Sequence, residues 1–359
     1  MINQWKKKFN TNKIIKDLKI NLKNKKFSEG QITKKFENKI SNFLKVKYTV
    51  ALPSGSVAIL LALMALDLKK NDEVIISNRG WISVLNALKI LNLKAIFVDV
   101  KENNPTMCLE SLKKKIGKNT KAIIPIHMGG RGCDIKKIKK MIKGKRISII
   151  EDAAQAFGSK FKGNFLGTKS DIGCFSLSVA KTISSGQGGF VVTNNKKTYN
   201  KIRKLKNNGL TDIKNINSWS NLGFNFKFTD IAATIAITEL QKFKTYKKKL
   251  IDLYKRYLKN IKNKHVEIIK IDINNGEIPQ YIEVMTKKRD KLVNYLKKNG
   301  VDIRIFYPNL SKNILYKKNI KTKFEHSEKF EKHGLYLPSG PDQNKNDIKK
   351  IINLVNNFK

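Results

Sequence analysis

Lys181 occupies a position where a lysine could do chemistry. It follows the apolar segment Phe175-Ser176-Leu177 and precedes a loop of small residues at 184–189. Such a loop lets backbones approach one another closely, and a lysine amine can act as a nucleophile or carry a proton. Most lysines of a lysine-rich chain lie in solvent, so the neighbours of Lys181, and not its residue type, single it out.

A second candidate group ends an apolar strand. Ile149-Ile150 is followed directly by two acids, Glu151 and Asp152. An acid that leaves an apolar strand must meet a cation or a strong hydrogen-bond donor, because an unpaired buried charge is costly. We therefore expect Asp152 to have such a partner. A purely structural salt bridge is the alternative at this point.

The turn Pro53-Ser54-Gly55-Ser56 is a candidate phosphate site. It follows a strand-like segment at 48–51 and opens an apolar helix that begins near Val57. The free N–H groups and the positive dipole end of a helix N-terminus suit a phosphate. Serine and glycine also cap many helices that bind no ligand, so the turn alone does not decide between the two interpretations.

A large α/β domain must position these groups. Between about residues 49 and 195, apolar and β-branched runs alternate with helical stretches. The strand candidates are 73–76, 95–100, 122–126, 147–150, 173–177 and 189–193, and the helix candidates are 56–68, 81–91, 108–116 and 134–143. Continuously apolar strands are typical of a mostly parallel sheet sandwiched by helices. In such a sheet the ligand site lies at the carboxyl ends of the strands.

The C-terminal part predicts a smaller α+β domain. A long helical region at 229–262 leads into a strand at 280–285 and helices at 289–299 and 345–358. We place the large domain at 1–245, including an N-terminal helical segment, and the small domain at 246–359. The boundary falls inside helical sequence.

The composition excludes several classes of protein. A chain of 359 residues with 40% hydrophobic residues can bury a large core, which excludes disorder over most of its length. Its longest apolar run, 57–66, is shorter than the roughly 20 residues that span a bilayer. The N-terminus shows no apolar signal region, so we expect a cytoplasmic protein without a membrane partner. The three cysteines lack CxxC spacing, which argues against disulfides and a metal site.

The charge favours a different class, a basic nucleic-acid-binding protein. The sequence has 74 Lys+Arg against 28 Asp+Glu, a formal net charge of +46. However, lysine strongly outnumbers arginine, the lysines are spread along the chain, and no recognition motif accompanies them. We keep this class as an alternative and expect no nucleic-acid partner.

Several motifs, taken in order, resemble the DegT/DnrJ/StrS aminotransferases. The similarity runs from about residue 30 to the C-terminus. It implies the aspartate-aminotransferase fold (fold type I) and pyridoxal-phosphate chemistry on nucleotide-linked keto-sugars. The motifs are Pro53-Ser54-Gly55-Ser56, Asp72-Glu73-Val74-Ile75, Trp81, Glu151-Asp152-Ala153-Ala154-Gln155, Phe175-Ser176 with Lys181 and Gly186-Gln187-Gly188-Gly189, and Gly223-Phe224-Asn225.

The resemblance implies a role for each residue around the cofactor ring. Lys181 would form the Schiff base with pyridoxal 5′-phosphate and then carry the proton between substrate and cofactor. Asp152 would pair with the pyridine nitrogen and keep it protonated. Gln155 would hydrogen-bond the ring 3-oxygen, and Trp81 would stack on the ring face.

The family pattern also implies a phosphate site and a second subunit. The phosphate would rest on Gly55, Ser56 and the hydroxyl of Ser176. Asn225 would reach this phosphate from the other subunit. We therefore expect a homodimer with shared active sites.

The implied reaction has two stages. An amino acid, by resemblance glutamate, would load the cofactor as pyridoxamine 5′-phosphate, and a nucleotide-linked keto-sugar would accept the nitrogen. A cyclitol or another ketone as acceptor is the alternative, whereas the dehydratases of the family lack the lysine that is present here.

Three positions in two motifs depart from the common family pattern and leave the substrate open. Gln187 stands where glutamate is common, and Phe226-Lys227 stands where tyrosine and arginine are common. His127, after the strand candidate 122–126, is interpreted as a structural histidine.

Overall fold

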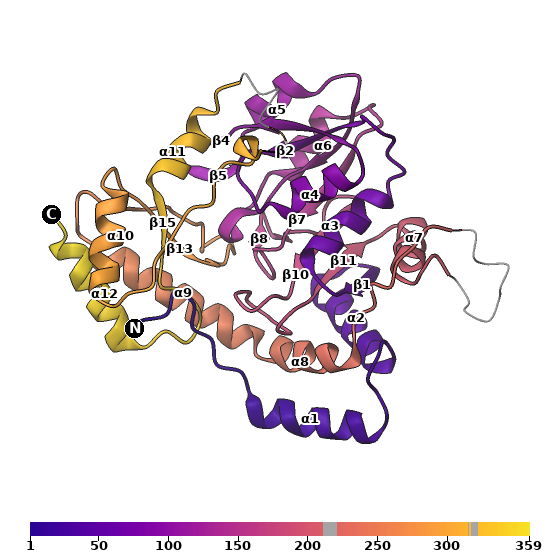
Figure 1. The fold of residues 1–359 in the computed structure, drawn as a ribbon, viewed down its shortest axis with the longest axis horizontal. Helices are drawn as coiled ribbons and strands as arrows, with labels where there is room; N and C mark the ends of the chain where they lie inside the picture. The colour runs from indigo at the N-terminus through magenta and orange to yellow at the C-terminus, as the bar shows by residue number, and fades with distance from the viewer. Residues whose placement is uncertain (211–220, 315, 317–321) are drawn as a thin grey trace.

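The large domain is built on a seven-stranded sheet (Figure 1). The computed structural model describes residues 1–210, 221–314, 316 and 322–359. Every adjacent pair is parallel except the two that involve β11, so the predicted mostly parallel sheet is confirmed. In order across the sheet, the strands are β1 (Tyr48–Leu52), β11 (Gly189–Thr193), β10 (Ile172–Ser176), β7 (Ser148–Asp152), β6 (Thr120–Ile124), β2 (Glu73–Ser77) and β3 (Lys94–Val98).

Both faces of this sheet are buried because its strands are apolar at successive positions. Ile75 and Ile76 are neighbours on β2, yet they pack into different core clusters on opposite faces. One cluster contains residues of α3 (Gly55–Met64), α4 (Ser83–Ile90) and α7 (Lys196–Lys206). The other contains residues of α5 (Leu109–Lys115) and α6 (Ile135–Met141). The predicted sandwich of helices around the sheet is confirmed.

One N-terminal helix, α2 (Gln31–Leu44), covers the remaining part of the sheet together with α8 (Asp230–Gln241). Phe36 and Ile40 of α2 share a core cluster with Phe190 of β11 and Ala233 of α8. The helix α1 (Thr11–Lys23) lies against α8 (Figure 1). The helical region predicted at 229–262 is two helices, α8 and α9 (Phe243–Asn260), separated by a break at Lys242.

The small domain is an antiparallel sheet backed by helices. The sequence predicted its α+β character but only one of its strands, at 280–285. Its strands, in sheet order, are β12 (Glu267–Ile268), β13 (Ile282–Met285), β15 (Gly334–Leu337) and β14 (Arg304–Ile305). Residues of α9, α10 (Arg289–Lys298) and α12 (Lys345–Asn357) pack with β13 and β15 in one core. The helix α11 (Glu325–His333) precedes β15. The boundary between 245 and 246, inside α9, stays a prediction.

The first residues of the chain lie against the small domain. Ile2 bridges to Val301 and Trp5 bridges to Ser339, and Ile2 belongs to the small-domain core. The chain then crosses to the large domain and enters α1 (Figure 1). Small antiparallel pairs, β4 (Val100–Lys101) with β5 (Asn104–Met107) and β8 (Lys160–Phe161) with β9 (Asn164–Phe165), complete the strands. Within the described ranges, no helix has the length and apolar character needed to span a bilayer.

Candidate active site

A cavity of about 350 Å³ lies where the large and small domains meet, beside the carboxyl ends of β7 and β10. Every residue predicted for the site lines it except Asn225. The predicted residues in its lining are Gly55, Ser56, Trp81, Asp152, Gln155, Ser176 and Lys181. The parallel sheet brings them together because the carboxyl ends of parallel strands share one edge.

Asp152 is the last residue of β7 and is buried. Its Oδ1 accepts a hydrogen bond from the N–H of Ala154 at 3.0 Å, and the described residues supply no hydrogen bond to its second oxygen. Burial raises the pKa of the Asp152 carboxyl, while the Ala154 hydrogen bond and the nearby charge of Lys181 act in the opposite direction. One carboxylate oxygen is therefore left for a cationic or N–H partner inside the cavity.

Lys181 lies in the loop that follows β10, with its N–H donating to the carbonyl of Ser178 at 3.1 Å. Its amine makes no hydrogen bond or ion pair with any described residue. Burial lowers the pKa of the Lys181 ammonium to about 8, and the negative charge of Asp152 partly opposes that shift. The amine is thus neutral, and nucleophilic, in a much larger fraction of molecules than a solvated lysine near neutral pH.

The N-terminus of α3 forms one end of the cavity. Ser54 caps the helix by accepting a hydrogen bond from the N–H of Val57 at 3.1 Å, which leaves Gly55 and Ser56 in the first turn facing the cavity. A Cβ on Gly55 would lie 2.9 Å from Cβ of Ser176, so glycine is needed for this turn to approach β10. Amides of the turn and the hydroxyl of Ser176 together suit a phosphate.

Two further predicted residues form the walls. Gln155 is buried, and its Oε1 accepts a hydrogen bond from the N–H of Gly129 at 3.0 Å, which leaves the side-chain NH₂ as a donor toward the cavity. Trp81 lies two residues before α4 and not inside a helix that starts at 81. Trp81 is 50% exposed, and its ring makes an edge-on contact with the ring of Tyr307 at a centroid distance of 4.8 Å.

These residues fit pyridoxal phosphate. At one end, the cavity offers helix N-terminal amides and a serine hydroxyl. It also offers a free carboxylate oxygen of Asp152, an amide donor on Gln155 and an unpaired amine on Lys181. Each matches one group of the cofactor: its phosphate, its pyridine nitrogen, its 3-oxygen and its aldehyde.

His127 is a structural residue, as interpreted from the sequence. Its Nδ1 accepts from the N–H of Cys133 at 3.1 Å, and its Nε2 lies 2.9 Å from Glu151. The Glu151 carboxylate also accepts hydrogen bonds from the backbone N–H groups of Gly167, Lys169 and Ser170. Of the two acids that end β7, only Asp152 therefore faces the cavity.

Sequence reasoning missed several lining residues. Tyr281 and Arg304 come from the small domain, and Ser83 and Ser178 come from the large domain. Tyr307 of the small domain also lines the cavity. The small-domain residues are more than 95 positions away from Lys181, so no local spacing could have linked them to the site.

Asn225 lies outside the cavity. It is exposed and forms an isolated antiparallel bridge with Asn207, just after α7. Its neighbours Leu222 and Phe224 are apolar yet 67% and 45% exposed. The predicted contact of Asn225 with the phosphate is therefore not made within one chain.

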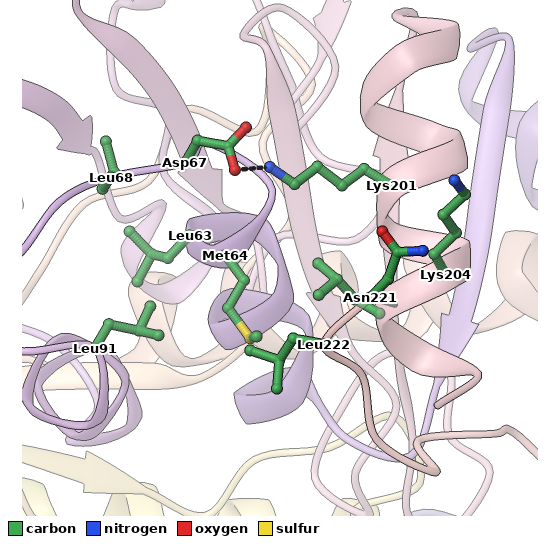
Figure 2. Close-up of a pocket in the computed structure, with 10 residues that line it drawn as sticks. Leu63, Met64, Asp67, Leu68, Leu91, Lys201, Lys204, Asn221 and Leu222 are labelled. Carbon is green, nitrogen blue, oxygen red and sulfur yellow. Dashed lines mark ion pairs between the residues drawn. The ribbon is translucent and has the colours of Figure 1, made fainter. Parts of the chain in front are cut away.

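A second hollow, of about 320 Å³, lies between the ends of α3 and α4 and helix α7 (Figure 2). Leu63, Met64 and Leu91 line it together with Leu222, and Asp67 forms an ion pair with Lys201 at its edge (Figure 2). Its charged groups are already paired or solvent-facing, so it offers no arrangement comparable to that of Lys181 and Asp152.

Comparisons with known proteins show the family and agree with the fold. A family model described as the DegT/DnrJ/EryC1/StrS aminotransferase family matches residues 9–356. A GDP-perosamine synthase of Escherichia coli O157:H7 is 32% identical over 345 residues, which cover 92% of this chain and 91% of that protein.

Solved structures share the fold over nearly the whole chain. S. venezuelae DesV, in complex with a ketimine intermediate, has a TM-score of 0.91 at 23% identity, covering 96% of this chain and 94% of that chain. The E. coli GDP-4-keto-6-deoxy-D-mannose-3-dehydratase with bound hydrated PLP has a TM-score of 0.91 at 23% identity and covers 99% of both chains. The predicted fold class is confirmed.

Proposed function

This chain belongs to the DegT/DnrJ/EryC1/StrS aminotransferase family, and from that premise we propose that it transfers an amino group from an amino acid to a nucleotide-linked keto-sugar with pyridoxal 5′-phosphate. The observation that carries the proposal is the placement of an unpaired lysine and a half-satisfied aspartate in one cavity. Such a pair is what a pyridoxal-phosphate enzyme needs to hold the two reactive ends of its cofactor.

Six residues of the cavity would hold the cofactor. Gly55, Ser56 and Ser176 would bind its phosphate, and Gln155 would donate to its ring oxygen. Asp152 would hold a proton on the pyridine nitrogen, and Lys181 would hold the aldehyde end through its Nζ. When bound, the cofactor would supply an electron sink for the substrate carbon.

Lys181 also moves the proton. Among the described residues, Lys181 contributes the only lysine side chain that lines the cavity. Its lowered pKa, near 8, suits a group that must take a proton from the substrate carbon and return it at working pH. The Lys181 amine is not held in an ion pair with the carboxylate of Asp152, so it remains available to accept a proton.

The acceptor that we propose is a nucleotide-linked keto-sugar. The support is the 32% identity with a GDP-perosamine synthase over nearly the full length of both chains. Arg304 adds a cationic group to the cavity lining, and the lysine-rich surface attracts anionic substrates at low salt. Glutamate is the proposed donor.

We further propose that the enzyme is a cytoplasmic homodimer with shared sites. Asn225 is exposed and outside its own cavity, next to the exposed apolar side chains of Leu222 and Phe224. Apolar side chains exposed in such a group are typical of a protein interface. A second copy packed over them would bring Asn225 toward the cofactor phosphate of its partner.

The test is chemical trapping. The protein is incubated with pyridoxal 5′-phosphate, treated with borohydride and digested, and the modified peptide is identified by mass spectrometry. We expect one modified residue, Lys181, and loss of the cofactor absorbance in Lys181→Ala. Lys118→Ala, at an exposed lysine, is the matched control and should behave as the wild type. Wild-type protein that binds no cofactor, or is labelled at lysines outside the cavity only, would overturn the proposal.

The substrate is tested separately. The enzyme is loaded as its pyridoxamine 5′-phosphate form and mixed with nucleotide-linked keto-sugars and with cyclitol ketones. Return of the lysine-bound cofactor spectrum with a nucleotide-linked keto-sugar supports the proposed acceptor. Return with cyclitol ketones alone would identify the alternative acceptor.

A further inference from the structure

Lys7, in the extended N-terminal segment, has a buried ammonium group. Its side chain is 1% exposed and forms an ion pair with Glu239 of α8, which is fully buried. The Lys7 Nζ also lies 4.5 Å from the ring centroid of Tyr246, whose hydroxyl donates to Glu239 at 2.9 Å. A charge in such a place is tolerated only when it is paired and hydrogen-bonded.

The remaining donors of Lys7 reach the backbone of the cavity loop. Its Nζ donates to the carbonyl of Thr182 at 3.0 Å and to the carbonyl of Lys181 at 3.3 Å. An ammonium has three N–H groups, so one ion pair and two carbonyls use all of them. Among the described residues, no other group donates to either carbonyl.

Gln280, next to β13 in the small domain, holds the same loop by a second route. Its Nε2 donates to the carbonyl of Ala180 at 2.7 Å, and its Oε1 accepts from the hydroxyl of Thr182 at 2.8 Å. Three consecutive residues, 180–182, are therefore fixed by side chains from outside the loop. This degree of restraint is unusual for a loop, which normally satisfies its carbonyls with water.

The segment that carries Lys7 is itself firmly attached. The N–H of Lys6 donates to the carbonyl of Ser339 at 3.0 Å, and the N–H of Lys8 donates to Asp342 at 2.8 Å. The segment leaves the small domain and runs toward α1, passing α9 on its way (Figure 1). Lys7 thus connects the small domain, α8 and the loop of Lys181.

We propose that Lys7 is a positioning residue for Lys181: its ammonium fixes the backbone at 181 and 182 so that the Lys181 amine projects into the cavity toward Asp152. The inference rests on the proposed function, in which Lys181 carries the cofactor. A lysine held at its own carbonyl and at the next one has little freedom to tilt its Cα–Cβ bond. A displacement of about 1 Å at a reacting group is enough to slow a reaction about 100-fold.

The experiment compares Lys7→Met with Lys6→Met. Methionine keeps an unbranched apolar side chain at position 7 but removes the donors. The side chain of Lys6 is 37% exposed, and its ammonium lies 3.8 Å from Asp347, so Lys6→Met is the matched control. Three readouts are taken on the full chain with cofactor bound: kcat and KM for the amino donor, the pH midpoint of the lysine-bound cofactor absorbance, and the unfolding midpoint.

We expect kcat of Lys7→Met to fall about 10- to 100-fold, with KM for the donor within about threefold of the wild type. We also expect the pH midpoint of its lysine-bound cofactor absorbance to move by about half a pH unit or more. A shifted Lys181 side chain would differ in burial and in its distance from the Asp152 charge, and both affect its pKa. Lys6→Met should match the wild type in all readouts. A Lys7→Met protein that is less stable but keeps the wild-type kcat and absorbance midpoint would show a purely structural role and overturn the inference.

Gln280→Met provides an independent measurement. It removes the two hydrogen bonds that Gln280 makes to the loop. If Lys7→Met does not fold, Gln280→Met by itself decides whether side-chain restraint of residues 180–182 positions the Lys181 amine. The same fall in kcat and the same kind of midpoint shift support the inference, and wild-type values overturn it. Borohydride trapping of the wild type separates this inference from the proposed function: no label at Lys181 refutes the proposed function, whereas a labelled wild type with unchanged variants refutes only the role of Lys7.

Discussion

Lys181 and Asp152 line the same cavity without forming an ion pair with each other. Both are desolvated, and each charge still acts on the pKa of the other across the cavity. Both groups therefore remain available to a ligand in this cavity of about 350 Å³.

Asp152→Asn tests the role of the carboxylate. The amide keeps the shape of the side chain but cannot hold a proton on the pyridine nitrogen. We expect cofactor binding to persist, because the phosphate contacts at α3 are unchanged, and kcat to fall about 100- to 1000-fold. Cofactor content is measured by absorbance and turnover by amino-sugar formation. The exposed Asp252→Asn is the control, and full activity in Asp152→Asn would refute the assigned role.

The pH dependence of cofactor attachment tests the environment of Lys181. Only the neutral amine attacks an aldehyde, and the pKa of this lysine is lowered to about 8. The rate of attachment to the cofactor-free protein should therefore rise with pH through a midpoint near 8 and level off above it. Because the Asp152 carboxylate raises the pKa of Lys181, the Asp152→Asn variant should show a lower midpoint. Stopped-flow absorbance measures both, and a midpoint near that of a solvated lysine would contradict the assignment.

Much of the site could be predicted from the sequence because its residues lie at the ends of strands. Asp152 and Ser176 are the last residues of β7 and β10, and Gly55 opens the helix after β1. The carboxyl ends of parallel strands lie along one edge of the sheet. Residues recognised at strand ends in the sequence could therefore be predicted to lie close together in the fold. The family resemblance then supplied the roles.

The rest depends on how distant segments pack. Arg304 and Tyr281 enter the cavity only because the small domain folds against the large one. Lys7 looks like any other lysine of a basic N-terminus, and its burial follows from the position of Glu239, more than 230 residues further along the chain. Similarly, the pattern at 229–262 predicted helix but not the break at Lys242, because no glycine or proline marks that position.

Gly55→Ala tests the close contact between the helix turn and β10. The new Cβ would lie 2.9 Å from Cβ of Ser176, so the turn or the strand must shift. We expect the free energy of unfolding to fall by about 1–3 kcal/mol and cofactor affinity to fall about tenfold. Gly117→Ala is the control, because a Cβ at that position would contact nothing within 4 Å. Urea unfolding and cofactor titration give the two values. Unchanged cofactor affinity in Gly55→Ala would contradict the proposal that this turn binds the cofactor phosphate.

Mixed dimers test whether Asn225 serves the site of a partner subunit. Lys181→Ala and Asn225→Ala chains, each with its own tag, are co-expressed, and the hybrid is purified by both tags. One site of the hybrid combines the wild-type Lys181 of one chain with the wild-type Asn225 of the other, so the hybrid should regain about half of the wild-type activity. Each homodimer should remain nearly inactive.

A second hybrid controls for recovery by mixing alone. Lys181 and Gly55 line the same cavity of one chain, so a hybrid of Lys181→Ala with Gly55→Ala contains one site without the lysine and one site with the altered turn. That hybrid should reach no more than about half the activity of the Gly55→Ala homodimer, because only one of its sites retains Lys181. If the Lys181→Ala and Asn225→Ala hybrid stays as inactive as its two parents, the sites are independent and Asn225 acts, if at all, within its own chain.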